Sequence, residues 1–299
     1  MTVINTNISA LTTQGALLAN SQTLATSMQQ LSTGKRINSA KDDGVGMAIA
    51  TRMTQQIQAL DLSARNAGDA ISLIQTAEGA TNEITSMLQR MHELSIQAVN
   101  DSITSEQRGY LNLEFQQLNQ QILQIAKTTE WNGTPILDGT VGTPVGPSVL
   151  DASEPRVGRL TFQIGASAGQ VLTFDLADFG SNGSITGAIT KDADSANPTV
   201  NISTAASALE ALGNLDTVME NVNGVRANMG AMMNRLVHVI NNLSNVVTNS
   251  KQTRSQIEDA DYAQVSTDLA RAQIIDQAAT AVLAQANSSA QNVLKLLQG

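Results

Sequence analysis

The sequence has no cysteine among its 299 residues, and aromatic residues make up only 2% of it. The missing cysteine excludes disulfide bonds and thiolate chemistry, although such a chain fits either redox compartment. A compact enzyme of this length usually fills its core with more aromatic side chains. The scarcity instead favours long helices packed side by side, with aliphatic side chains in the seams between them.

The chain also lacks a basic surface and a long apolar segment. Its formal net charge of -9 argues against nucleic-acid binding, which needs a basic footprint. No run of 18 apolar residues occurs, so we expect no membrane insertion. The first residues lack the basic start and apolar block of a signal peptide, so if the protein leaves the cell we expect a route that uses none.

Proline is confined to one part of the chain, because all five prolines lie between Pro135 and Pro198. Proline breaks helices, so two long helical arms are expected to flank a non-helical insert. In the arms, apolar residues recur at a spacing of three and four. The sequence therefore predicts a mainly α fold: an elongated antiparallel helical bundle over 45–130 and 205–254, with a loop and β-hairpin insert at about 135–200.

Local patterns give the ends of some of these elements. Thr104 and Gln107 form a capping-box pattern at the start of a helix, and Ser207 and Glu210 suggest a second one. Within the insert, apolar residues alternate with polar ones over 160–164 and 172–176, with a Gly- and Ser-containing loop between. This alternation predicts a β-hairpin, and the remainder of the insert is expected to be loop.

The two ends of the chain are almost free of charge. Residues 1–34 and 277–294 contain no charged side chain, and Lys295 is the only one after Asp276. Two frayed, solvated helices are one interpretation, but solvated helices normally carry Lys and Glu. The alternative is that both ends are disordered in the free chain and become helical on assembly. In a polymer, a buried charge would face copies of itself unpaired, so uncharged side chains suit a packed interior.

Both ends carry a helical seam, and we predict that these seams drive polymerisation into an open fibre of identical subunits. The seam at the beginning of the chain is interrupted, whereas the one at the end is rich in Ala. The predicted polymerisation seam consists of Ile4, Ile8, Leu11, Leu18, Leu24, Met28, Leu31, Val265, Leu269, Ala279, Leu283, Ala286, Ala290, Val293 and Leu297.

Three stretches resemble the motifs of a known family. LSTGKRINSAKDDGVGMAIA at 31–50 resembles the N-terminal motif of bacterial flagellins, and so does the start at 4–7. RSQIEDADYA at 254–263 and AQANSSAQNVLKLL at 284–297 resemble the C-terminal motif. The resemblance covers both arms and the hairpin, while the central region is reduced to little more than that hairpin.

The resemblance implies a structural subunit of the bacterial flagellar filament, which serves swimming motility, and not an enzyme. It implies inner-tube terminal helices from 1–45 and 255–299, forming one discontinuous domain, and an outer helical bundle from 46–254. The implied partners are copies of the chain itself, a flagellar export chaperone, the filament cap and hook-junction proteins. Type III export and an extracellular location follow, and no cofactor is expected.

The family's outer bundle also carries a patch recognised by Toll-like receptor 5 of a host. LQRMHELSIQ at 88–97 resembles this motif, with Gln89, Arg90 and Leu94 in place, and Glu114 matches on the next helix. Arg90 and Leu94 are four residues apart, so they are expected to share a helical face. The alternative is that Leu94 belongs partly to the core and Arg90 is merely solvated.

The sequence contains no complete catalytic or metal-binding motif of the kinds considered. His92-Glu93 begins like the zinc-protease motif HExxH, but Ile96 stands where the second histidine is needed. The charges around Lys35, Asp42 and Asp43 are expected to form a contact zone between inner and outer layers, with Asp42 or Asp43 capping a helix that starts near 44. The rival interpretations are a hook–filament junction protein, an enzyme carried on such a scaffold, and an adhesin or receptor agonist.

Overall fold

The computed structural model describes residues 6–145, 157–180, 186, 189 and 200–298. Its internal contacts divide the chain into two compact units, one formed by 1–58 with 247–299 and the other by 59–246. The helices α2 (Gly44–Val99) and α5 (Ala205–Glu258) contribute residues to both units. The predicted mainly helical fold with a small β insert is confirmed.

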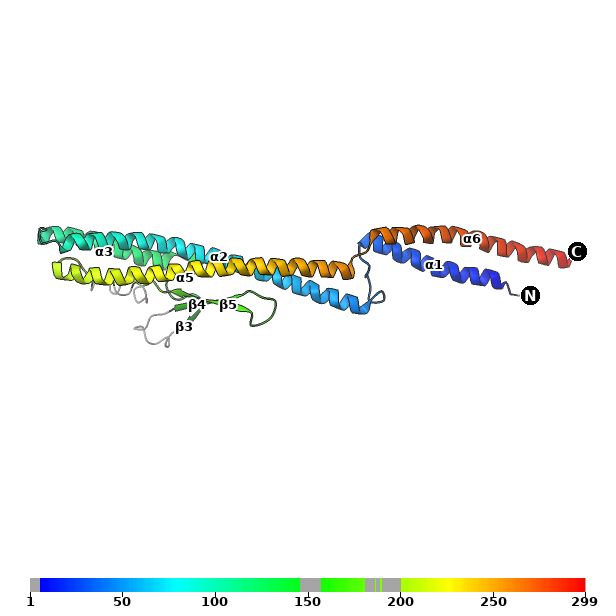
Figure 1. Ribbon diagram of the computed structural model, residues 1–299, viewed down its shortest axis with the longest axis horizontal. Helices are drawn as coiled ribbons and strands as arrows, with labels where there is room; N and C mark the ends of the chain where they lie inside the picture. Colours follow the sequence, from blue (N-terminus) through cyan, green and yellow to red (C-terminus); the bar gives the residue numbers. More distant parts are fainter. Residues whose placement is uncertain (1–5, 146–156, 181–185, 187–188, 190–199, 299) are drawn as a thin grey trace. The chain divides into compact units, whose positions relative to one another are not determined.

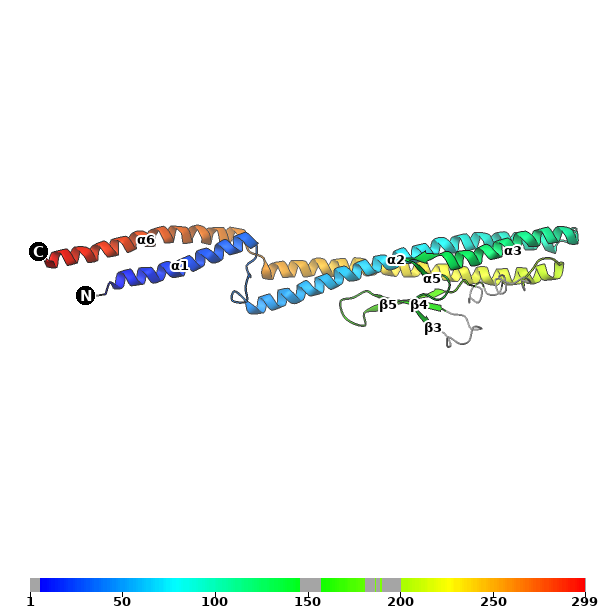
Figure 2. The ribbon, with the colours of Figure 1, turned by 180° about the vertical axis from the view of Figure 1, so that it is seen from behind.

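The unit formed by 59–246 is a helical bundle with a single apolar core. Here α2, α5 and the intervening helix α3 (Ser105–Thr128) run alongside one another (Figures 1 and 2). Each helix places large aliphatic or aromatic side chains on its inner face, and burying one such side chain stabilises the fold by roughly 1.5–3 kcal/mol. Fully buried members include Ile84, Leu88, Met91, Phe115, Ile122, Leu215, Val222 and Leu236.

Side-chain caps fix where two helices of the bundle begin. The capping box at Thr104 and Gln107 is confirmed, with both reciprocal bonds present at the start of α3. The box predicted at Ser207 and Glu210 is wrong, because α5 starts earlier: the Ser207 amide donates to Thr204 Oγ1 (3.1 Å) and the Thr204 amide donates to Ser207 Oγ (3.2 Å). Ser207 thus accepts the bond from the backbone amide of the cap residue, which in a capping box is usually accepted by a Glu or Gln three residues after the cap.

The insert forms two small antiparallel sheets. Strands β1 (Glu130–Trp131) and β2 (Thr134–Pro135) flank a tight turn in which Asn132 and Gly133 both have positive φ. The predicted hairpin is confirmed as β4 (Val157–Gln163) and β5 (Val171–Ala177), with Leu160 opposite Phe174. Phe174 and its neighbours Leu172 and Leu176 are buried and join the bundle core.

A third strand, β3 (Thr143–Val145), pairs with β4 where a loop was predicted. Its three residues are too few to show an alternating pattern, so only the pairing with β4 defines the strand. Other loops predicted in the insert, at 146–156 and over most of 181–199, lie outside the described residues. The sheet is tied to the bundle by Asn66 of α2, whose amide donates to the Gln163 carbonyl at 3.1 Å.

The other unit contains the helices from both ends of the chain, α1 (Ile8–Thr33) and α6 (Tyr262–Gln298). Asn7 caps the start of α1, and Gly34 ends it with a φ of 72°, which a residue with a side chain rarely adopts. The two helices lie side by side and antiparallel (Figure 1), with Asn7 bonded to Ala286 and Asn20 to Ala272. Among the described helices, none is long and apolar enough to cross a membrane.

The bundle core predicts unequal effects for two neighbouring positions of α3. Phe115 is completely buried, so Phe115→Ala should lower the free energy of unfolding by about 3–5 kcal/mol. Leu113 is 64% exposed on the same helix, and Leu113→Ala should change it by less than about 0.5 kcal/mol. Urea denaturation followed by circular dichroism measures the free energy of unfolding of both variants. If both lost the same amount, Phe115 would not lie in the core with Leu113 outside it.

Candidate assembly and recognition surfaces

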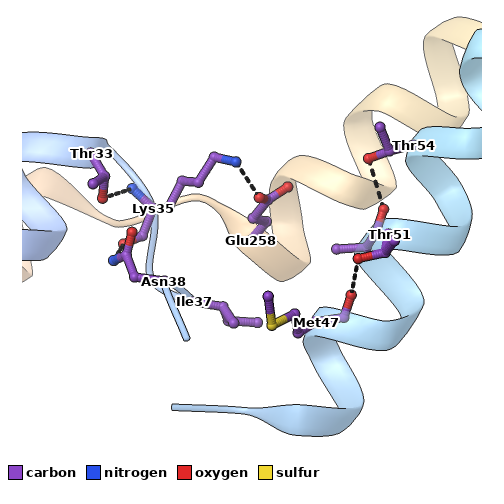
Figure 3. A pocket seen from close by; sticks show the side chains of 9 residues that line it. Thr33, Lys35, Ile37, Asn38, Met47, Thr51, Thr54 and Glu258 are labelled. Atoms are coloured by element: carbon purple, nitrogen blue, oxygen red, sulfur yellow. Dashed lines mark hydrogen bonds and ion pairs between the residues drawn. The ribbon is translucent and has the colours of Figure 1, made fainter. Parts of the chain in front are cut away.

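A clasp joins the segment after α1 to the end of α5. The Arg36 amide donates to the Glu258 carbonyl at 2.7 Å, and the Ala260 amide donates to the Gly34 carbonyl at 2.9 Å. The Lys35 ammonium forms an ion pair with the Glu258 carboxylate (Figure 3). These contacts hold together residues more than 200 positions apart in the sequence, one from each arm.

The acidic residues after the clasp shape the start of α2. The Gly46 amide donates to Asp43 Oδ1 at 2.8 Å, so the predicted cap is Asp43. Asp42 instead accepts bonds from the Ser39 and Asn38 amides, and these hold its pKa below the usual value. Because the folded form lowers this pKa, the contribution of Asp42 to stability is present near neutral pH and is lost as the pH falls through it.

A cleft of about 500 Å³ lies beside the clasp (Figure 3). Its apolar side is formed by Ile37, Met47 and Ala50, and its ionisable lining residues, Lys35 and Glu258, already pair with each other. Such a lining offers neither a nucleophile with an adjacent base nor a set of metal ligands. Within the part of the chain that the structure describes, no cluster of three or more His, Cys, Asp or Glu could hold a metal.

Helix α1 packs against α6 with a side that mixes polar and apolar residues. Asn20 and Ser27 are buried there and Leu17, Leu24 and Leu31 are half-buried, whereas Ile8, Leu11, Leu18 and Met28 are exposed, Leu18 to 65%. On α6, Ile274 and Val282 are similarly exposed, at 66% and 55%. The pair thus carries exposed aliphatic side chains on both helices, far more than a solvated helix pair needs.

The structure divides the predicted seam into three groups. Ile8, Leu11, Leu18 and Met28 are exposed. Leu24, Leu31, Leu269, Ala279, Leu283 and Ala286 are half-buried, and Val265 is buried. Ile4 lies outside the described residues, and nothing is described of the side chains of Ala290, Val293 and Leu297.

Three exposed apolar residues of α6 escaped the sequence analysis: Ile274, Ile275 and Val282. They do not fall on the three-four seam, because that seam marks the side of α6 that faces α1. For Val282, the charge-free stretch from 277 to 294 was a signal that pointed to the right segment. Nothing in the periodicity singled out Ile274 and Ile275, which precede that stretch.

The predicted receptor patch lies on α2 and α3. Gln89, Arg90 and Glu114 are exposed, and Arg90 Nε donates to Glu114 Oε1 at 2.9 Å. The same guanidinium also donates to Glu93 Oε2 at 3.1 Å, and the hydrogen bonds to Glu114 and Glu93 raise the pKa of Arg90. The sequence predicted the positions but not this ion-pair network across two helices.

Leu94 differs from the expectation that it shares an exposed face with Arg90. It is 1% exposed and packs into the bundle core, because it lies on the side of α2 that faces the core, whereas Arg90 lies on the exposed side. The exposed apolar side chains nearby in the sequence are instead Ile96 on α2 and Tyr110 and Leu113 on α3. His92, whose partial zinc motif failed, lies 3.2 Å from Asp216 of α5, an ion pair whenever the imidazole is protonated.

Comparison with known proteins agrees with this architecture. The model of the bacterial flagellin N-terminal helical region matches residues 4–142, and that of the C-terminal helical region matches residues 212–297. The flagellin of Halalkalibacterium halodurans is 37% identical over 296 residues, covering 99% of this chain and 100% of that protein. The flagellin of Bacillus subtilis is 38% identical over 312 residues, with 99% of each chain covered.

Among solved structures, a Vibrio parahaemolyticus protein described as flagellar hook-associated aligns with a TM-score of 0.54. The match covers 73% of this chain and 100% of that one at 16% identity, so it shows a shared fold alone. The two flagellin regions and the nearly full-length relatives carry the assignment. This chain belongs to the bacterial flagellin family, the structural subunits of the flagellar filament.

Proposed function

We propose that this flagellin polymerises with its own copies by burying the exposed apolar side chains of the α1–α6 pair. Residues 1–45 and 255–299 would form the inner tube of the filament, and residues 46–254 its outer bundle. The supporting observation is the row of large apolar side chains that α1 leaves exposed, which includes Ile8, Leu11 and Leu18. No described part of the same chain covers these side chains, whereas a neighbouring copy would.

The magnitudes favour assembly. Full burial of one Leu or Ile side chain contributes roughly 1.5–3 kcal/mol, so several such side chains can offset the estimated 4–15 kcal/mol cost of association. Residues 1–34 and 277–294 carry no charge, so burying them does not add the free-energy cost of removing an ion from water. The same apolar side chains would recur on every copy, so the contact could continue along an open fibre.

The other proposed partners of this protein are inferred from its membership of the flagellin family. The chain would leave the cell through the flagellar type III apparatus, escorted by an export chaperone. It would then assemble beneath the filament cap onto hook-junction proteins, and serve swimming motility. A junction protein is the rival assignment, and the match over 100% of the Halalkalibacterium halodurans flagellin favours the filament subunit.

A second proposal concerns the exposed network around Arg90. Gln89, Arg90 and Glu114 match the family's motif for Toll-like receptor 5 and present their polar groups at the surface. The rigid pairing of Arg90 with Glu114 across α2 and α3 would offer a receptor a preformed array of charges. Leu94 would support this array from the core, since its own side chain is buried.

Limited proteolysis of the free chain should trim both ends and leave a resistant fragment of roughly 45–255. The α1–α6 pair buries few apolar side chains, mainly Val265 and Ala272, so its local stability should be low. Mass spectrometry of the fragments gives the cleavage sites. Full protection of either end in the free chain would contradict a low local stability of the α1–α6 pair.

A charge on the exposed face of α6 should block polymerisation without unfolding the bundle. Val282→Asp is the best single change, because Val282 is 55% exposed and does not support the α1–α6 contact. Leu283→Asp and Ala286→Glu should act in the same direction. Burying an unpaired charge costs several kcal/mol, so the critical concentration should rise by about a hundredfold or more, since each 1.4 kcal/mol is tenfold.

The matched control for Val282→Asp is Leu209→Asp, which adds the same charge at a 64% exposed position of α5 in the bundle. Sedimentation after salt-induced assembly gives the critical concentration, and circular dichroism gives the melting temperature. The control should assemble at the native concentration. If Val282→Asp did so as well, the exposed face of α6 would not be an assembly contact.

Removing the ion pair with Arg90→Ala and Glu114→Ala should weaken Toll-like receptor 5 signalling at least tenfold and leave filaments intact. Both side chains are about half exposed, so their loss should leave the fold stable. A cell reporter assay measures signalling, and electron microscopy checks the filaments. Glu93→Ala, which removes only the second partner of Arg90, is the control and should have a smaller effect; unchanged signalling in the double variant would remove the receptor assignment.

A further inference from the structure

Two asparagine side chains hold α1 on α6 through main-chain carbonyls. Asn20 Nδ2 donates to the Ala272 carbonyl at 2.7 Å in a buried contact, and Asn7 Nδ2 donates to the Ala286 carbonyl at 3.1 Å. Asn20 is one of the two buried residues of α1, and it is polar. The same side of α1 carries the half-buried Leu17 and Leu24, so the amide bonds act together with apolar packing.

The two bonds belong to one antiparallel register. Asn20 follows Asn7 by 13 residues, and Ala272 precedes Ala286 by 14, which is close to the same distance along two helices. This register places Thr13 midway between the two asparagines and opposite Ala279, and both of these are half-buried. The contact therefore extends over about two helical turns on each side of Thr13.

Apolar packing and the two amide bonds share in setting this register. The side of α6 that faces α1 carries the small side chains of Ala272, Ala279 and Ala286, which fit several alignments, together with the half-buried Leu269 and Leu283. A slip by one turn would bring Asn20 opposite Asp276 or Leu269, whose larger side chains would hinder access to the carbonyl. A longer slip would break the clasp, in which the Arg36 amide donates to the Glu258 carbonyl at 2.7 Å.

We propose that Asn20, assisted by Asn7, is a positioning residue that fixes the register and rotation of α1 on α6. A buried polar residue at a helix contact is known to select one register at some cost in stability. Here the selected arrangement keeps Ile8, Leu11 and Leu18 outward, so it also decides which face is offered to other copies. This role rests on the proposed polymerisation only in its consequence, because the register itself is a property of one chain.

Cysteine pairs can report the register directly, because the native sequence contains no cysteine. Thr13→Cys with Ala279→Cys reports the observed register, and Thr13→Cys with Leu283→Cys reports a slip of one turn. Each pair is placed in the native background, in Asn20→Leu, in Asn20→Ala and in the control Ser21→Leu, which adds the same side chain at the neighbouring exposed position. Intramolecular disulfides are counted after mild oxidation of pelleted filaments and of the soluble chain.

The native chain and Ser21→Leu should favour the Thr13–Ala279 disulfide by about tenfold or more, the scale of one net hydrogen bond at 1.4 kcal/mol per tenfold. In Asn20→Leu and Asn20→Ala the preference should fall below about threefold. A native preference near one, or an unchanged preference in both Asn20 variants, would overturn the role of Asn20. Failure of every variant to pellet would instead count against the proposed polymerisation, and the soluble chain would still judge the register.

Discussion

The cost of removing an unpaired charge from water governs both ends of this protein. A contact that repeats along a polymer brings each side chain close to copies of itself, so a charge placed there has no complementary partner. Residues 1–34 and 277–294 respond to this constraint by carrying none. Asn, Ser and Thr take the polar positions instead, and Asn20 satisfies its amide with a main-chain carbonyl of α6. Hydrogen bonding without charge therefore suits the proposed burial of the terminal pair in a filament.

The two units obtain their stability from different sources. The unit formed by 59–246 buries large side chains such as Phe115, Phe179 and Ile74 in one core shared by helices and sheet. The other unit buries smaller side chains, among them Ile37, Ile57, Val265 and Ala272, together with Asn20 and Ser27 of α1. Its α1–α6 pair leaves several large aliphatic side chains exposed, among them Leu18 and Ile274.

Charged residues are concentrated where the chain needs definite local geometry and not where copies would meet. Lys35 pairs with Glu258 at the clasp, Asp43 caps α2, and Arg90 joins α2 to α3 through Glu114. Each of these charges has a partner within the same chain and remains at least partly exposed, so none carries the full cost of desolvation. Charged side chains thus make local contacts elsewhere in the chain and are absent from 1–34 and 277–294, the segments proposed to assemble.

The sequence by itself determined the helical arms, the hairpin at 160–176 and the charge-free ends, because periodicity, proline placement and charge are local properties of the chain. It also indicated the family through the motifs at 31–50 and 254–263. Contacts between distant segments were decided only by the tertiary structure. Strand β3 exists because β4 pairs with it, Leu94 is buried because α2 turns that position inward, and Ile274 is exposed because α1 covers the other side of α6. Burial depends on which neighbours pack against a side chain, and spacing along one helix does not specify those neighbours.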